Sequence, residues 1–182
     1  MQEIIEILKR NLKLMNSILT LEVLSMSLYY KYKKEKFLEK YKCATSALED
    51  LKASLSEYRQ NNNRIIRRAI FAFFQDFSEY IIDMCESYIV INNGKIDSST
   101  SALQLIEISY EMGFFDETLK DYLYKCVKLR NRYNHDYYKR EIVEKQIEEF
   151  YYSQIIYLDI FLENSKDDII LKYRKNNYSL RL

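Results

Sequence analysis

Residues 64–91, RIIRRAIFAFFQDFSEYIIDMCESYIVI, carry the cleanest apolar pattern in this chain of 182 residues. Large apolar side chains recur in it at steps of three and four residues: Ile66, Ile70, Phe73, Phe74, Phe77, Ile81, Met84 and Tyr88. That spacing places them on one face of an α-helix. The sequence therefore predicts a long helix at the centre of the core.

Two further helical patterns precede this segment. Residues 2 to about 30 and about 35 to 60 each carry apolar side chains at helical spacing, and a lysine-rich stretch interrupts the pattern between them. We expect two separate helices here. The run of asparagines at 61–63 favours a turn after the second.

Capping signals divide the rest of the chain. Ser101, with Gln104 three residues later, forms a capping box that predicts the start of a short helix, and Gly113 suits the left-handed residue that follows one. Asp116 can cap the next helix, which we expect at about 117 to 132. A final long helix is expected at about 138 to 165.

Composition favours helices almost throughout. The chain has no proline and only two glycines, so the strongest breakers of regular structure are nearly absent, and its 48% hydrophobic content is enough for one sizeable core. We therefore expect an all-α protein. No window approaches 18 uninterrupted apolar residues and no signal peptide precedes the first pattern, so we expect a cytoplasmic protein without membrane contact.

The basic residues are bunched, although the formal net charge is only +1. Clusters lie at 31–36, 59–68, 125–140 and 172–181. For the first and fourth we expect solvated helix faces, and around the third a site for a polyanion. The three cysteines are too far apart in sequence to bind zinc with a single histidine, so we expect buried thiols, no metal site and no cofactor.

The third cluster surrounds the stretch Arg130-Asn131-Arg132-Tyr133-Asn134-His135-Asp136-Tyr137, which holds the only histidine of the chain. An imidazole can exchange a proton near neutral pH, and a guanidinium can hold a phosphate with a planar fork of donors. Together they indicate phosphodiester chemistry without a metal. The alternative for His135 is that it merely caps the last helix.

Arg130 follows in phase the apolar stripe of the helix at 117–132, so it is directed toward a packed seam. A buried guanidinium needs an anion, an interface or a ligand. An internal salt bridge with Asp83 or Asp76 is the structural alternative to a functional role. Residues five apart on an unbroken helix differ by about 140° around its axis, so we expect a break between Arg130 and His135, at Asn134.

The arginine, the polar residue after it and the later histidine resemble the signature of the HEPN superfamily of small helical proteins. Tyr137 extends this resemblance to the HepT toxins, over roughly residues 36 to 165. The resemblance implies an up-and-down helical bundle of HEPN type at 35–165. Residues 1–34 would then be an additional N-terminal helix that packs on the bundle or lengthens a dimer interface, and 166–182 a basic C-terminal tail.

The function expected from these residues and this resemblance is a metal-independent endoribonuclease toxin that acts at the composite site of a homodimer. The catalytic residues would be Arg130, His135 and Asn131, and Tyr137 would receive AMP from an MntA-like nucleotidyltransferase antitoxin. The RNA substrate would contact further residues of the third cluster: Arg132, Lys128, Lys139, Arg140 and Tyr133. Tyr133 and Tyr138 are the candidates for base stacking.

Two alternatives remain open from the sequence. The first is a non-catalytic HEPN protein that binds a nucleotidyltransferase or a nucleotide, with Arg130 and His135 holding phosphate without cleaving it. The second is a helical scaffold whose apolar stripes serve oligomerisation alone.

Overall fold

The computed structural model describes residues 2–166, with side chains from residue 13 onward except that of residue 137. Its helices are α1 Gln2–Asn61, α2 Arg64–Ile91, α3 Ala102–Glu111, α4 Glu117–His135, α5 Arg140–Gln154 and α6 Ile156–Ser165, with the short 3₁₀ helix η1 at Tyr137–Lys139. The described residues contain no strand. The expected all-α class is confirmed, and the pattern at 64–91 predicted α2 to the residue.

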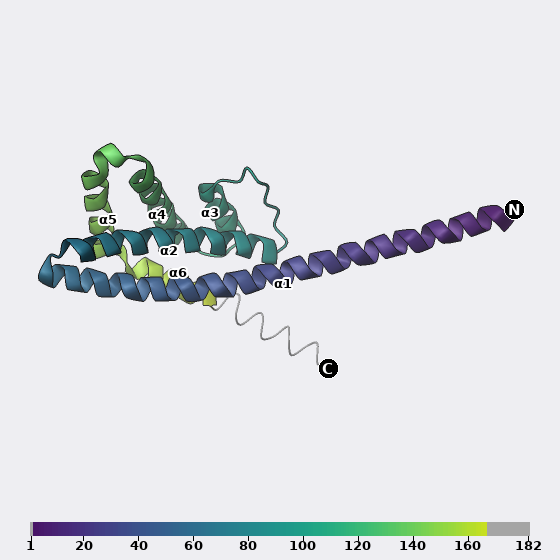
Figure 1. Cartoon of the computed structure of the whole chain (residues 1–182), viewed down its shortest axis with the longest axis horizontal. Coiled ribbons are helices and arrows are strands. Elements are labelled where there is room, and N and C mark those ends of the chain that lie inside the picture. The colour runs from purple at the N-terminus through teal and green to yellow at the C-terminus, as the bar shows by residue number, and fades with distance from the viewer. Residues whose placement is uncertain (1, 167–182) are drawn as a thin grey trace.

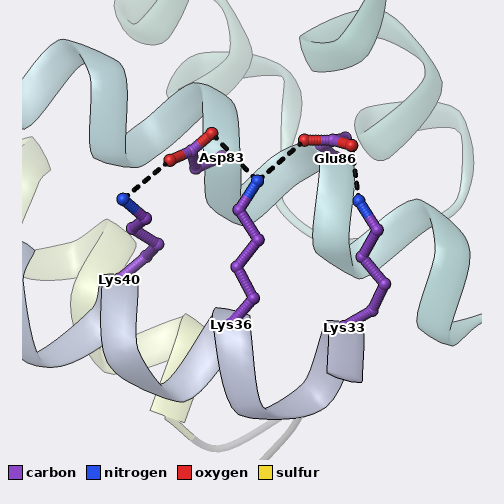
Figure 2. Close-up of polar contacts among 5 residues, drawn as sticks. All are labelled: Lys33, Lys36, Lys40, Asp83 and Glu86. Atoms are coloured by element: carbon purple, nitrogen blue, oxygen red, sulfur yellow. Dashed lines mark hydrogen bonds and ion pairs between the residues drawn. The ribbon is translucent and has the colours of Figure 1, made fainter. Parts of the chain in front are cut away.

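The first 60 residues after Met1 form one helix, so the prediction of two helices with a break near residue 31 is wrong. The lysine-rich stretch at 31–36 does not interrupt α1, and two of its four lysines, Lys33 and Lys36, are ion-paired with α2. Lys33 is buried, and its Nζ lies 2.5 Å from Glu86 Oε1. Lys36 and Lys40 reach Asp83 at 3.4 and 3.1 Å (Figure 2). We expected a solvated helix face for the first basic cluster. Lys33 and Lys36 of this cluster instead lie in the interface between α1 and α2.

The core forms where the second half of α1 runs antiparallel to α2 (Figure 1). Phe37, Leu48 and Leu51 of α1 are buried, as are Ile70 and Phe74 of α2. Helices α3, α4 and α5 cover the other side of α2, and α6 lies beside α1 (Figure 1). The arrangement is a helical bundle with α2 at its centre.

The first half of α1 projects beyond this bundle (Figure 1). From residue 14 to 29 its apolar side chains are about half or more exposed: Leu14, Met15, Ile18, Leu19, Leu21, Val23, Leu24, Met26, Leu28 and Tyr29. Residues 14–29 therefore do not pack on the bundle, which was one of the two roles expected for this segment.

The predicted turns and caps are present. Asn63 accepts a hydrogen bond from the Ile65 amide at the start of α2, and Ser101 and Gln104 form the expected capping box. Gly113 has φ +81°, the left-handed conformation that suits a residue just after a helix. Asp116 Oδ1 accepts from the Leu119 amide at 2.8 Å, which caps α4.

The chain after α4 differs from the prediction. The expected helix at 138–165 is divided into η1, α5 and α6, with Ile155 between the last two. This division lets α6 lie against α1, where Lys52 Nζ contacts Asp159 Oδ1 at 2.5 Å. The fourth basic cluster and the expected tail at 166–182 lie outside the described residues, apart from Lys166.

Two of the three cysteines are buried thiols, as expected. Cys85 and Cys126 are fully buried, and burial raises the pKa of Cys85 to about 12. Cys43 is only partly buried. Within the part of the chain that the structure describes, no group of His, Cys, Asp and Glu side chains is placed to hold a metal ion.

Candidate functional site

Arg130 lies at the seam between α4 and α2, as its phase in the apolar stripe predicted. Its guanidinium forms an ion pair with Glu79 of α2 through Nη2 and donates from Nη1 to Asn131 Oδ1 at 2.8 Å. Its Nε is buried without a hydrogen-bond partner among the described residues. Only 22% of the side chain is exposed, so the guanidinium is held from two sides.

The predicted partners of Arg130, Asp83 and Asp76, are wrong. Residues 76, 79 and 83 follow one another by three and four positions, so all three lie on one stripe of α2. Of the three, Glu79 forms the ion pair with Arg130. Asp83 is instead ion-paired with Lys36 and Lys40 of α1. The pattern identified the correct face of α2 but not the correct turn.

His135 is the last residue of α4, and the expected break at Asn134 is absent. The Asp136 amide donates to the Arg132 carbonyl at 2.7 Å, and the Arg132 and Asp136 side chains pair at 3.3 Å. Both contacts span Asn134 and keep it helical. The helix therefore ends at the motif histidine itself, with Asp136 as its C-cap.

Arg130 and His135 consequently differ by about 140° around a common helix axis. Around the helix axis Asn131 lies between Arg130 and His135, and along the axis it lies one turn before His135. Its side chain therefore lies between the faces that carry the guanidinium and the imidazole. His135 is exposed, and it makes no hydrogen bond or ion pair within the described part of the chain. One chain thus brings Arg130 and Asn131 together but leaves the imidazole on a different face.

The five predicted RNA-binding residues fall on two grooves. Lys128 and Arg132 line a shallow groove of about 490 Å³ between α4 and α5. There Arg132 Nη1 donates to Gln146 Oε1 at 2.7 Å. Tyr133, Lys139 and Arg140 line a larger groove of about 1070 Å³ that also includes the start of α2.

The larger groove, hereafter the α2–α5 groove, contains residues that the sequence argument did not assign. Arg64, Arg67, Arg68 and Phe71 of α2 form one of its walls. The signal was present, because Arg64, Arg67 and Arg68 belong to the second basic cluster. The sequence alone could not place that cluster beside the third, from which about 60 residues separate it.

Tyr133 forms part of the wall of this groove, and its ring is already in contact with other side chains. Its ring packs against Phe71 at 5.5 Å between centroids, and the Arg140 guanidinium lies 4.5 Å from the ring centre. Arg140 also donates to the Tyr133 hydroxyl at 2.7 Å. Tyr138 is 69% exposed. The side chain of Tyr137, the predicted AMP acceptor, lies outside what the structure describes.

A comparison with protein families adds to this geometry. The model of a family described as Ribonuclease HepT-like matches residues 1–163, which include every described residue of the site. The chain belongs to the HepT-like ribonuclease family. The all-α bundle is thus of HEPN type, and the family match supports a ribonuclease function. No match was found among curated proteins or among solved structures.

The match begins at residue 1, earlier than the resemblance at 36–165. The projecting half of α1 therefore lies inside the segment that this HepT-like chain shares with its family. Among the described helices, none is long and apolar enough to cross a membrane.

Proposed function

We propose that this HepT-like protein is the endoribonuclease toxin of a toxin–antitoxin pair and cleaves RNA without a metal ion. The family match carries the proposal, since its range includes the whole stretch from Arg130 to Tyr137. The fixed guanidinium of Arg130 and the exposed imidazole of His135 supply the two kinds of group that such cleavage needs.

In the proposed reaction the ribose 2′-hydroxyl attacks the adjacent phosphorus and the bond to the 5′-oxygen breaks. The products are a 2′,3′-cyclic phosphate and a free 5′-hydroxyl. His135 acts as general base on the 2′-hydroxyl or general acid on the leaving oxygen. Arg130 stabilises charge on the non-bridging oxygens, and Asn131 orients the phosphate or the guanidinium that it already contacts.

The site is proposed to be shared by two copies of the chain. In one copy Arg130 and His135 lie on different faces of α4, and a single imidazole cannot be both acid and base in one turnover. A two-fold dimer supplies a second imidazole and allows the guanidinium of one copy to meet the His135 of the other. RNA phosphate would then meet a guanidinium that Glu79 and Asn131 hold in place.

The proposed antitoxin is an MntA-like nucleotidyltransferase that transfers AMP from ATP to the Tyr137 hydroxyl and releases pyrophosphate. The added anion would repel RNA phosphates at the end of α4. Mass spectrometry after co-expression should find an adduct on Tyr137 that disappears in Tyr137→Phe and persists in Tyr138→Phe. An adduct that follows Tyr138 instead would refute the assignment.

The test of the nuclease is cleavage of a structured RNA by the full-length protein in the presence of a metal chelator. His135→Ala should lower the rate by at least 100-fold with unchanged helical content, while the exposed control Lys95→Ala should retain full activity. An RNA with 2′-deoxyribose at the cleaved position should resist cleavage. Undiminished cleavage by His135→Ala would exclude the mechanism.

One observation favours a second candidate function. Arg130 is already neutralised by Glu79 and lies away from His135 within a single chain. A non-catalytic HEPN protein that binds a nucleotidyltransferase or a nucleotide would have no need to bring the two together. Such a protein would bind the partner or nucleotide and leave RNA intact at every protein concentration.

A further inference from the structure

We infer that the α2–α5 groove binds the RNA strand that flanks the cleaved linkage, through phosphate contacts with Arg64 and Arg68. This inference rests on the proposed ribonuclease function. It assigns a role to the start of α2, a segment far from the Arg130–His135 motif in sequence.

The first argument is the charge of the groove. Five basic and two acidic side chains line it. Arg67 is paired with Glu144 at 2.9 Å and with Glu148 at 2.6 Å, and Arg140 is occupied by the Tyr133 hydroxyl. Arg64 and Arg68 are exposed and form no ion pair or hydrogen bond within the part of the chain that the structure describes. Their charges are available to an incoming anion.

The second argument is where these arginines lie on α2. Helix N-termini carry a partial positive charge, so acidic residues are favoured in the first turn and basic residues are disfavoured there. The first turn of α2 has no acidic residue, and it begins with Arg64. Arg67 and Arg68 follow directly. Because this arrangement is locally unfavourable, the added positive potential points to an anionic ligand.

The third argument is spacing. Arg64 and Arg68 are one helical turn apart on one face, with about 6 Å between their Cβ atoms. That distance is comparable with the separation of successive phosphates along a nucleic-acid strand. Guanidinium groups hold phosphates through paired donors, so two phosphates can be bound side by side.

The fourth argument favours RNA over an acidic protein surface. The groove continues from α2 to Tyr138, whose ring is 69% exposed and has Lys139 Nζ at 5.4 Å from its centre. An aromatic ring beside a cation is a pairing that nucleic-acid sites use for a base and its phosphate. Tyr133, two residues before His135, forms a wall of the same groove. Tyr133 and His135 differ by about 200° around the axis of α4. A strand in the groove therefore reaches His135 around the end of α4, past Tyr138 and Lys139, which also line the groove. Acidic protein side chains would make no use of the exposed ring.

The test uses full-length protein with His135→Ala, so that RNA is bound but not cut, and a fluorescently labelled single-stranded RNA. Adding Arg64→Gln and Arg68→Gln should weaken binding about tenfold or more at physiological salt. The slope of log affinity against log salt should fall by about 1.4, because each lost phosphate contact on a single strand contributes roughly 0.7. In the protein with His135 intact, the same pair should raise KM and leave kcat unchanged.

The control removes two positive charges elsewhere, through Lys42→Gln and Lys95→Gln. Both lysines are exposed and neither lines the groove, so binding and salt slope should stay near the parent values. Equal affinity in the arginine and lysine variants would overturn the inference. So would an arginine variant that keeps RNA affinity but loses a nucleotidyltransferase partner, since the groove would then bind protein.

A last outcome separates this inference from the proposed function. RNA binding that depends on Arg64 and Arg68, without any cleavage by the protein with His135 intact, would support the groove as an RNA site and refute the proposed ribonuclease activity.

Discussion

At the scale of single residues, the contact between Glu79 and Arg130 determines what the guanidinium can do. A partly buried arginine with an adjacent carboxylate is both positioned and neutralised. Asn131 adds a second contact to Nη1, so the planar group has little freedom to turn. Glu79 is therefore a positioning residue in the proposed reaction, because it acts through Arg130.

Glu79→Gln should lower kcat roughly tenfold, since the guanidinium loses its charged partner and its fixed orientation. KM should not rise, because the change also removes a negative charge that repels RNA. The pH profile of cleavage should keep its shape, because the proposed acid–base group, His135, is unchanged. Steady-state cleavage kinetics at several pH values measures all three. Glu57→Gln, an exposed carboxylate on α1, is the control, and a rise in KM at constant kcat in Glu79→Gln would contradict the positioning role.

The residue scale also shows what the sequence could and could not predict. The apolar stripe of α4 correctly directed Arg130 into a seam, because that depends only on helical periodicity. Whether Arg130 pairs with Glu79, Asp76 or Asp83 depends on the position of α4 along the axis of α2. A local sequence pattern holds no information about that position. At Asn134, the helix continues although asparagine often ends one, and the Arg132–Asp136 contacts span this position.

At the scale of helices, the lysines of α1 show how a correct pattern led to a wrong element boundary. Lysines among apolar positions read as an interruption when the chain is taken alone. In the bundle they face Asp83 and Glu86 of α2 and form a ladder of ion pairs (Figure 2). Periodicity and caps predicted α2, α3 and the start of α4, whereas α1 and the division of the last helix at Ile155 depend on tertiary contacts.

Glu86 makes this ladder sensitive to acid. Burial alone would raise its pKa, but the hydrogen bond from Lys33 and the charges of Lys33 and Lys36 outweigh that effect and lower the pKa of Glu86. A carboxyl whose folded pKa lies below its unfolded value stabilises the protein above the unfolded value, about 4.3. That contribution is lost as the pH falls through the folded pKa.

Glu86→Gln should therefore destabilise the protein by about 1–3 kcal/mol at pH 7, because it leaves the buried Lys33 without its counter-charge. The difference from the parent should shrink as the pH falls below about 4. Urea unfolding at several pH values measures it. Glu57→Gln again serves as the control. A difference that stays constant down to pH 3 would show that the Lys33–Glu86 charge pair is not the cause.

At the scale of the whole molecule, the projecting half of α1 has apolar side chains that no other part of the described chain covers. Around residues 14–29 the apolar side chains occupy most of the helix circumference. Asn16, Thr20 and Ser27 form a narrow polar strip, and Ser17, Glu22 and Ser25 are the polar residues outside it. A helix with this much exposed apolar surface is normally covered. The proposed reaction needs two copies, and the family match includes this segment. A second copy of the chain is therefore the occupant that we propose.

Ile18→Glu with Leu21→Glu should convert the dimer to a monomer, because both side chains lie near the middle of the apolar strip. Sedimentation of the full-length protein measures the change. RNA cleavage should fall with dimer content, since each proposed site needs residues from two copies. Asn16→Glu with Ser27→Glu places the same two charges on the polar strip of the same helix, so dimer and activity should persist. A monomeric Ile18/Leu21 variant that cleaves RNA at the parent rate would show that one chain assembles the site alone, despite the separation of Arg130 from His135 on α4.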